Sequence, residues 1–167
     1  EEGIRALAQA LPTLHADARD RRARHDALYG AWLCGATLGH VGMGLHHKLC
    51  HTLGGTFNLP HAETHTVVLP HALAYNAQAA AGAMARVARA LGRADGGDPL
   101  SPARALHALA GRLGAPTSLR AIGMPADGLD RAADLAVQTP YPNPRALERQ
   151  ALRALLQRAF DGTPPQD

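Results

Sequence analysis

The sequence predicts an all-α fold, because of its composition and of the positions of its prolines and glycines. Alanine, the strongest helix former, makes up about a fifth of the 167 residues, whereas Val and Ile together occupy only seven positions. So few β-branched residues leave little with which to build a sheet. Pro or Gly stands at nearly every junction between apolar periodic segments, as expected where helices begin and end. We expect one helical domain over 1–162 and a frayed tail over 163–167.

The expected helices, in chain order, are 3–15, 18–38, 43–53, 62–76, 79–91, 102–113, 128–138 and 144–160. Pro12 should disturb the first of these, because proline removes a backbone donor. Ser101 before Pro102 and Asn143 before Pro144 are typical of N-caps followed by proline in the first helical turn. Glycines that follow apolar runs should cap helix C-termini, at Gly92, Gly114 and Gly162. The loop 95–99 is expected to be a surface connector.

Charge and cysteine content exclude several classes of protein. The formal net charge of +3 is too small to favour nucleic acid or an anionic membrane surface. Segment 27–45 contains no Asp, Glu, Lys or Arg, but its glycines, threonine and histidine make it a poor membrane span. We expect a helix there whose small residues allow close packing. Cys34 and Cys50 cannot build a disulfide framework, so a reducing, cytoplasmic setting is expected.

Histidine is the anomaly of the composition. Seven of the ten histidines fall within 32 consecutive residues, at positions 40, 46, 47, 51, 61, 65 and 71. His47 and His51 stand four apart on one expected helix, and His61 and His65 repeat that spacing on the next, so each pair shares a helix face. Gly54-Gly55 lies between the pairs and is expected to break the chain into a tight turn.

Imidazoles from two converging helices could hold a metal, because imidazole is a common ligand of zinc and iron. A catalytic metal usually takes three protein ligands, often with a carboxylate among them. Glu63 would point about 200° away from His61 on a helix, so it is a poor third ligand. His15, His25, His40 and His107 are interpreted as structural or surface residues, with no partner at a useful spacing.

Three segments resemble the signature region of the iron-containing alcohol dehydrogenase superfamily: 44–55, 59–65 and 69–76. Within them, HHKLCH at 46–51 and LPHAETH at 59–65 are similar to the maleylacetate reductase branch. The resemblance implies a helical C-terminal domain of the dehydroquinate synthase-like kind. It also implies an N-terminal nucleotide-binding domain, which we expect to be absent here because no strand followed by a Gly-rich phosphate loop is found.

The implied activity is the reduction of maleylacetate, a dicarboxylate, to 3-oxoadipate by NADH or NADPH during bacterial breakdown of aromatic compounds. By resemblance, His47 and His61 occupy metal-ligand positions for iron or zinc, with further ligands on a helix preceding Glu1. His51 matches a histidine that lies near the nicotinamide and is the candidate proton donor. His46 and Lys48 are the candidate partners of the substrate carboxylates. The family also implies a homodimer of the full-length enzyme.

Three alternatives remain at this point. His47 and His61 either bind a metal that polarises the substrate oxygen or, without a metal, hydrogen-bond that oxygen directly. The protein could instead be an iron-dependent alcohol dehydrogenase of the same superfamily. It could also be a non-catalytic helical module that takes up metal or binds a partner.

Overall fold

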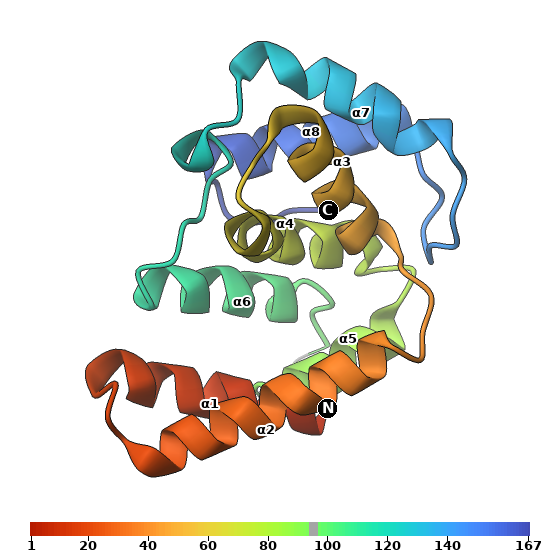
Figure 1. Ribbon diagram of the computed structural model, residues 1–167. Helices are drawn as coiled ribbons and strands as arrows, with labels where there is room; N and C mark the ends of the chain where they lie inside the picture. The colour runs from red at the N-terminus through yellow and green to blue at the C-terminus, as the bar shows by residue number, and fades with distance from the viewer. Residues whose placement is uncertain (94–96) are drawn as a thin grey trace.

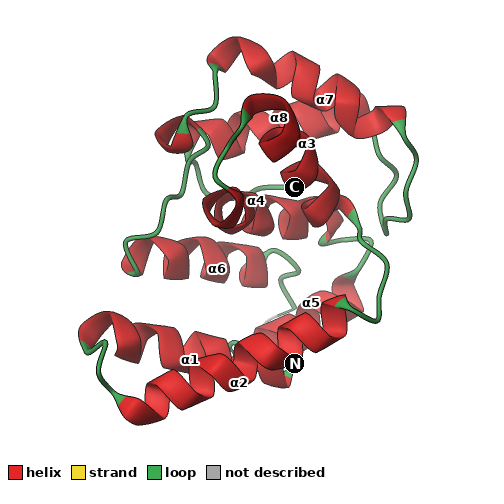
Figure 2. Ribbon diagram, in the orientation of Figure 1, coloured by secondary structure: helices red, strands yellow, loops and turns green. Residues whose placement is uncertain are grey.

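The computed structural model describes residues 1–93 and 97–167, and it confirms the all-α class (Figure 1). Within those residues the chain is helix and loop, without a strand (Figure 2). The α-helices are α1 (Glu2–Ala16), α2 (Arg21–Leu38), α3 (Leu45–Phe57), α4 (His61–Asn76), α5 (Ala81–Ala90), α6 (Ser101–Arg112), α7 (Leu129–Gln138) and α8 (Arg149–Asp161). Two short 3-10 helices, η1 (Arg120–Ile122) and η2 (Ala126–Gly128), precede α7. Residues 95 and 96 of the expected connector 95–99 lie outside the described residues.

Helix α4 is the centre of the larger part of the molecule, where it packs against α3, α6 and α8. Helix α7 lies along α8 and also meets α3. The main hydrophobic core fills the space among α3, α4, α7 and α8, and its fully buried side chains include Leu49, Tyr75 and Leu155. Burying side chains of this size is the principal source of stability. The core therefore fixes α3 and α4, which carry most of the histidine cluster.

Helices α1 and α2 form a hairpin below this core in Figure 1, and α1 continues the packing toward α5. The two helices approach closely because Gly3 and Gly30 face each other: a Cβ at Gly30 would lie 3.1 Å from the Gly3 carbonyl oxygen. Close packing within segment 27–45 is thus confirmed at Gly30, whereas the helix ends at Leu38 and a Cβ at Gly35 or Gly42 would meet nothing within 4 Å. No helix within the described residues is long and apolar enough to cross a bilayer.

Helix α3 does not end where the sequence predicts. It runs through Gly54 and Gly55 to Phe57, and the turn follows at Asn58, whose backbone is left-handed with a φ of 54°. Glycine in a helix costs about 1 kcal/mol relative to alanine. Burial of Leu53 and the contact of the Phe57 ring with Gly128 oppose that cost and keep the last turn helical.

Helix α8 begins at Arg149, so the expected start at 144 is wrong. The backbone of 144–148 bonds instead to α4: the Glu148 amide donates to Tyr75 Oη, and Tyr75 Oη donates to the Ala146 carbonyl. The Asn143 side chain pairs with Asn76 rather than capping a helix. These long-range bonds satisfy the groups that a first helical turn would have used.

Four smaller expectations can also be compared with the structure. Helix α1 continues through Pro12. Ser101 is the first helical residue rather than the N-cap, and Asp98 accepts a bond from the Leu100 amide instead. Within 163–167, Arg158 donates to the Gln166 carbonyl and Arg145 pairs with Asp167, and the fraying of this tail stays a prediction. The expected C-terminal glycines are confirmed, since Gly92, Gly114 and Gly162 all have positive φ.

Because of the Gly3–Gly30 contact, we expect alanine substitution at two glycines of α2 to change the free energy of unfolding in opposite directions. Gly30→Ala should lower the free energy of unfolding by about 1 kcal/mol or more, because overpacking outweighs the gain in helix propensity. Gly35→Ala meets nothing within 4 Å and should raise the same quantity by about 0.5–1 kcal/mol. Urea denaturation followed by circular dichroism measures both. Equal effects of the same sign would contradict the close contact.

Candidate active site

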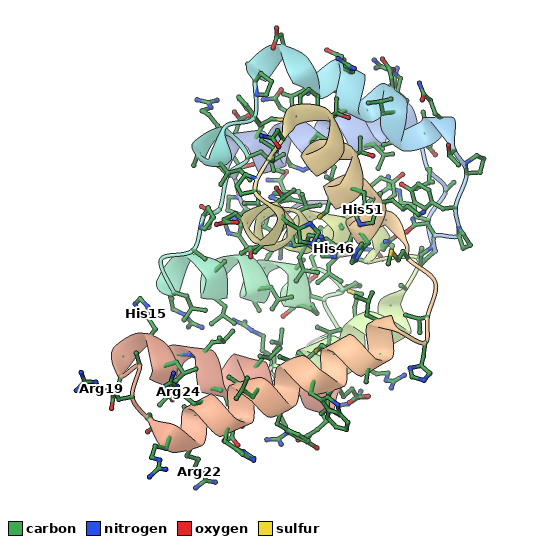
Figure 3. The ribbon with its side chains drawn as sticks, in the orientation of Figure 1. His15, Arg19, Arg22, Arg24, His46 and His51 are labelled. Atoms are coloured by element: carbon green, nitrogen blue, oxygen red, sulfur yellow. The ribbon has the colours of Figure 1, made fainter. Side chains whose placement is uncertain are left out.

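The buried side of α3 sets the directions of its histidines. Leu45, Leu49 and Leu53 recur every four residues and are fully buried in the core. His47 and His51 follow the same spacing two residues later, so they lie about 200° further around the helix, away from the leucine row. His47 is half-buried and His51 is exposed. Figure 3 shows His51 and His46 where α3 lies over α4.

Helix α4 brings a second pair of imidazoles to the same place. The chain turns at Leu59 and Pro60, and the helix begins at His61. The His61 and His65 ring centroids are 4.4 Å apart, and the His65 ring lies 4.7 Å from that of His47. The His47 and His51 rings are 4.9 Å apart. Four imidazoles therefore form a continuous series in the order His51, His47, His65, His61.

His65 is the hub of this cluster, although the sequence analysis gives it no role. Its ring touches those of His46, His47 and His61, and its Nε2 is buried without a hydrogen-bond partner among residues 1–93 and 97–167. The spacing of four from His61 indicates a shared helix face with His61. That spacing alone could not show that His65 would lie against α3.

His46 lies behind the exposed cluster. Its Nε2 is 3.0 Å from the His65 carbonyl oxygen. Because a carbonyl oxygen can only accept, Nε2 is the donor, and this hydrogen bond links α3 to α4. Burial lowers the pKa of His46, which keeps the ring neutral. A neutral ring with its one N–H already used offers a carboxylate no donor. The substrate-binding role of His46 stays a prediction, and the observed hydrogen bond competes with it. Lys48 is exposed on the same helix, so its ammonium group is accessible to a substrate carboxylate.

Lowered pKa values favour the neutral form of the imidazoles of His46, His47 and His65. Burial lowers the pKa of His65 to about 4, and the neighbouring imidazoles His46, His47, His61 and His51 lower it further. Burial also lowers the pKa of His47, with added repulsion from His51, His61 and Lys48. Neutral imidazoles have a free lone pair, so they can accept a hydrogen bond or ligate a metal at neutral pH.

The chain supplies only part of the metal site that the sequence predicts. His47 and His61 come from two helices and converge on His65, which suits imidazole ligation. Within the described residues, however, neither belongs to a group of three His, Cys, Asp or Glu ligand atoms close enough to hold an ion. The group that does meet that condition is His46, Cys50 and His65, and Cys50 is a residue that the sequence analysis assigned no ligand role.

A cavity of about 290 Å³ opens beside the cluster, with His46 and His47 in its wall. The rest of the lining is mostly apolar, with Asn76 and Asn143 as the other polar residues. Cavities of roughly this size hold small organic molecules. The structure therefore places space for a small ligand next to the neutral imidazoles.

His71 lies elsewhere on α4 and is not part of the cluster. It is 1% exposed, and its ring faces His107 of α6 at 6.1 Å between centroids. Neither of its ring nitrogens has a hydrogen-bond partner in the described part of the chain. Burial, then the charges of His107 and Arg158, lower the pKa of His71 to about 4. His71 and His107 are residues of the interior packing between α4 and α6.

Comparison with known proteins extends over almost the whole chain. The model of the Fe-containing alcohol dehydrogenase family, C-terminal, matches residues 1–160. The chain is 63% identical to a maleylacetate reductase of Burkholderia cepacia over 99% of its length, and 58% identical to one of Sphingobium indicum over the same share. It covers 45% of each of these relatives. The crystal structure of a maleylacetate reductase from Agrobacterium tumefaciens has a TM-score of 0.91 and 53% identity, covering 98% of this chain and 45% of that one.

The buried His71 generates a prediction about pH. The unfolded chain protonates this residue near pH 6.5, whereas the folded chain resists protonation until about pH 4, so stability falls as the pH drops through that window. At pH 5 the contribution of His71 to this loss is about 2 kcal/mol. His71→Leu should therefore lose about 2 kcal/mol less than the wild type between pH 7 and pH 5, as measured by urea denaturation. An unchanged pH dependence would contradict burial of a neutral His71.

Proposed function

This chain belongs to the Fe-containing alcohol dehydrogenase family, and we propose that it is the helical active-site domain of a reductase that converts maleylacetate to 3-oxoadipate. The observation that carries the proposal is its identity to maleylacetate reductases along nearly its whole length. The imidazole cluster on α3 and α4, beside a cavity of suitable size, supports it chemically.

The chain spans about 45% of the length of those relatives, and we propose that the activity belongs to a longer protein of which it is a part. We propose that the remaining length binds NADH or NADPH. The cofactor, when bound, supplies a hydride to the carbon–carbon double bond of the substrate. The residues of this chain then have two tasks: they bind an anionic keto acid, and they deliver a proton to the carbon next to the one that receives the hydride.

His51 is the proposed proton donor. It is exposed on α3, so it can regain its proton from water after each turnover, and it lies 4.9 Å from His47 between ring centroids. A histidine suits general acid catalysis near neutral pH because its intrinsic pKa is close to the working pH. Neutral His47 can accept a hydrogen bond from His51 and keep the His51 ring oriented.

Lys48 is the proposed partner of a substrate carboxylate. It is exposed on α3 one residue from His47, and its ammonium group offers three donors and a positive charge. Bound carboxylate would also reduce the electrostatic repulsion that Lys48 exerts on a charged imidazole. His61 would hydrogen-bond the keto oxygen together with His47 if no metal is used.

A metal would be held by His47 and His61, and it would polarise the keto oxygen. The two imidazoles fit such an ion, but they are two ligands of the three or more that a catalytic metal takes. The remaining ligands would come from elsewhere in the longer protein. Iron and zinc both accept imidazole, so the donor set of this chain fits either.

The exposed side of α2 supports the presence of a further domain. Trp32 is 65% exposed and Leu28 is 73% exposed, on a helix whose other side packs against α1. Large apolar side chains gathered on one helix usually mark a contact surface. We propose that the remaining length of the longer protein covers this side of α2. A homodimer of the whole enzyme remains the expectation from the family resemblance.

Two other functions use the same residues. An iron-dependent alcohol dehydrogenase of this family would also use His47 and His61, and an assay of maleylacetate against ethanol and propanediol decides between them. A non-catalytic metal-binding module would show neither activity in the longer protein.

Replacing His51 tests the proposed acid. In the longer reductase, His51→Ala should lower kcat by about 10²–10⁴, the usual contribution of a general acid, with a smaller change in KM. Lys48→Met should mainly raise KM for maleylacetate. The control is His25→Gln, which should keep wild-type rates. His25 is an exposed residue near the N-terminus of α2. A kcat of His51→Ala close to that of the control would overturn the assignment.

Replacing Trp32 tests the covered surface. Trp32→Lys should change the free energy of unfolding of the 167-residue chain by less than about 0.5 kcal/mol, because the side chain is exposed there. In the longer protein the same substitution should be clearly destabilising, since it would bury a charge. Thermal denaturation of the wild type and of Trp32→Lys, in the 167-residue chain and in the longer protein, measures the two changes in stability. An equally small effect in both proteins would show that α2 is not covered.

A further inference from the structure

A second ligand group shares His65 with the imidazole cluster and extends from it to His46 and Cys50 on α3. One ring nitrogen of His46, one of His65 and the Cys50 sulfur lie within 4.8 Å of one another. We propose that His46, Cys50 and His65 form a binding site for a thiophilic divalent cation, of which Zn²⁺ is the type.

The helix geometry prepares this group. His46 and Cys50 are four residues apart on α3, so their side chains lie one above the other on one face. His65 reaches the same point from α4, and its ring packs edge-on to that of His46 with centroids 4.9 Å apart. The three ligands therefore come from two helices whose relative position is already fixed by the core.

The hydrogen bond of His46 selects its ligand atom. Because Nε2 is directed at the His65 carbonyl at 3.0 Å, a neutral ring keeps its proton on Nε2 and its lone pair on Nδ1. Metal-ligating histidines in proteins commonly donate their other ring N–H to a backbone carbonyl or a carboxylate, which fixes the ring orientation. His46 already has this supporting bond without a metal.

His65 has a polar atom that no described residue satisfies. Its Nε2 is buried and makes no hydrogen bond within the described residues. An unsatisfied buried nitrogen costs roughly 1–3 kcal/mol, and coordination of a cation would remove that cost. This atom is the independent sign that the group binds something.

Cys50 gives the site its selectivity. The thiol is 1% exposed, and burial raises its pKa to about 12, so the free side chain stays protonated and unreactive. Binding of Zn²⁺ would form a sulfur–metal bond and release the thiol proton to solvent, with no change of oxidation state. Thiolate and imidazole together select zinc over magnesium or calcium.

The fit requires small side-chain movements. Zinc binds sulfur at about 2.3 Å and imidazole nitrogen at about 2.0–2.1 Å, so tetrahedral ligand atoms stand roughly 3.3–3.6 Å apart. The present limit of 4.8 Å must therefore shrink by about 1 Å, which side-chain torsions can supply. Three ligands leave a fourth position for water. The site differs in ligand chemistry from the proposed His47–His61 site, where all the ligands of this chain are nitrogens.

Titration with Co²⁺ tests the proposal, because a cobalt–thiolate bond gives a charge-transfer band in the near ultraviolet that all-nitrogen sites lack. The 167-residue chain should show this band at one equivalent, and Zn²⁺ should abolish it by displacement. Cys50→Ser should lose the band completely. Cys34→Ser removes the exposed cysteine of α2 and should keep the band.

Two further variants make the result decisive. His65→Gln should weaken Co²⁺ binding by at least about tenfold, since loss of a ligand exceeds the effect of losing a supporting residue. It provides the test if circular dichroism shows that Cys50→Ser is unfolded. The double variant His47→Ala with His61→Ala should keep the band, because its sulfur ligand is untouched.

The absence of a band in the wild-type chain, or its loss in Cys34→Ser rather than Cys50→Ser, would overturn the proposal. So would full-strength binding by a folded His65→Gln. The measurement needs no substrate or nicotinamide, so its outcome is separate from that of the reductase activity.

Discussion

Burial of Leu45, Leu49 and Leu53 along one side of α3 is the constraint on which the site depends. Rotation of α3 about its axis would expose these leucines at a cost of roughly 1.5–3 kcal/mol each, so the helix has one stable orientation. That orientation turns His47 and His51 outward and His46 and Cys50 toward α4. The hydrophobic core thus divides one short histidine-rich helix into an exposed side and a shielded side with different chemistry.

Helix α4 connects the histidine cluster to the segment that precedes α8. Its first turns carry His61 and His65, and its last turns carry Tyr75 and Asn76, which bond to the segment 143–148. Arg145 also lies over the Tyr75 ring, 4.3 Å from its centroid. The segment before α8 is therefore held to α4 by polar bonds and a cation–π contact. It forms part of the cavity wall beside the cluster through Asn143 and Pro144.

Crowding of imidazoles explains how the two proposed sites can coexist. Protonating one ring in the cluster makes protonation of its neighbours less favourable, and burial adds to the effect at His46, His47 and His65. The rings of His46 and His47 therefore pack edge to face against that of His65 as neutral groups. The outer rings retain contact with water and suit proton transfer. The inner ones combine with a buried thiol and suit a soft cation.

The sequence by itself determined the helical class, the i, i+4 pairs of histidines and the family resemblance, because these follow from composition and from periodicity within single helices. It did not determine that His65 lies at the centre of the cluster or that Cys50 joins His46, since both depend on how α3 and α4 meet. It also misplaced several boundaries, above all the end of α3 and the start of α8. Intrinsic preferences of about 1 kcal/mol at Gly54-Gly55 were outweighed by burial of Leu53 and by the contact of Phe57 with Gly128, and the segment after Asn143 bonded to Tyr75 instead of forming a helical turn. Tertiary packing decided these points because the groups that compete with local preference are far away in the chain.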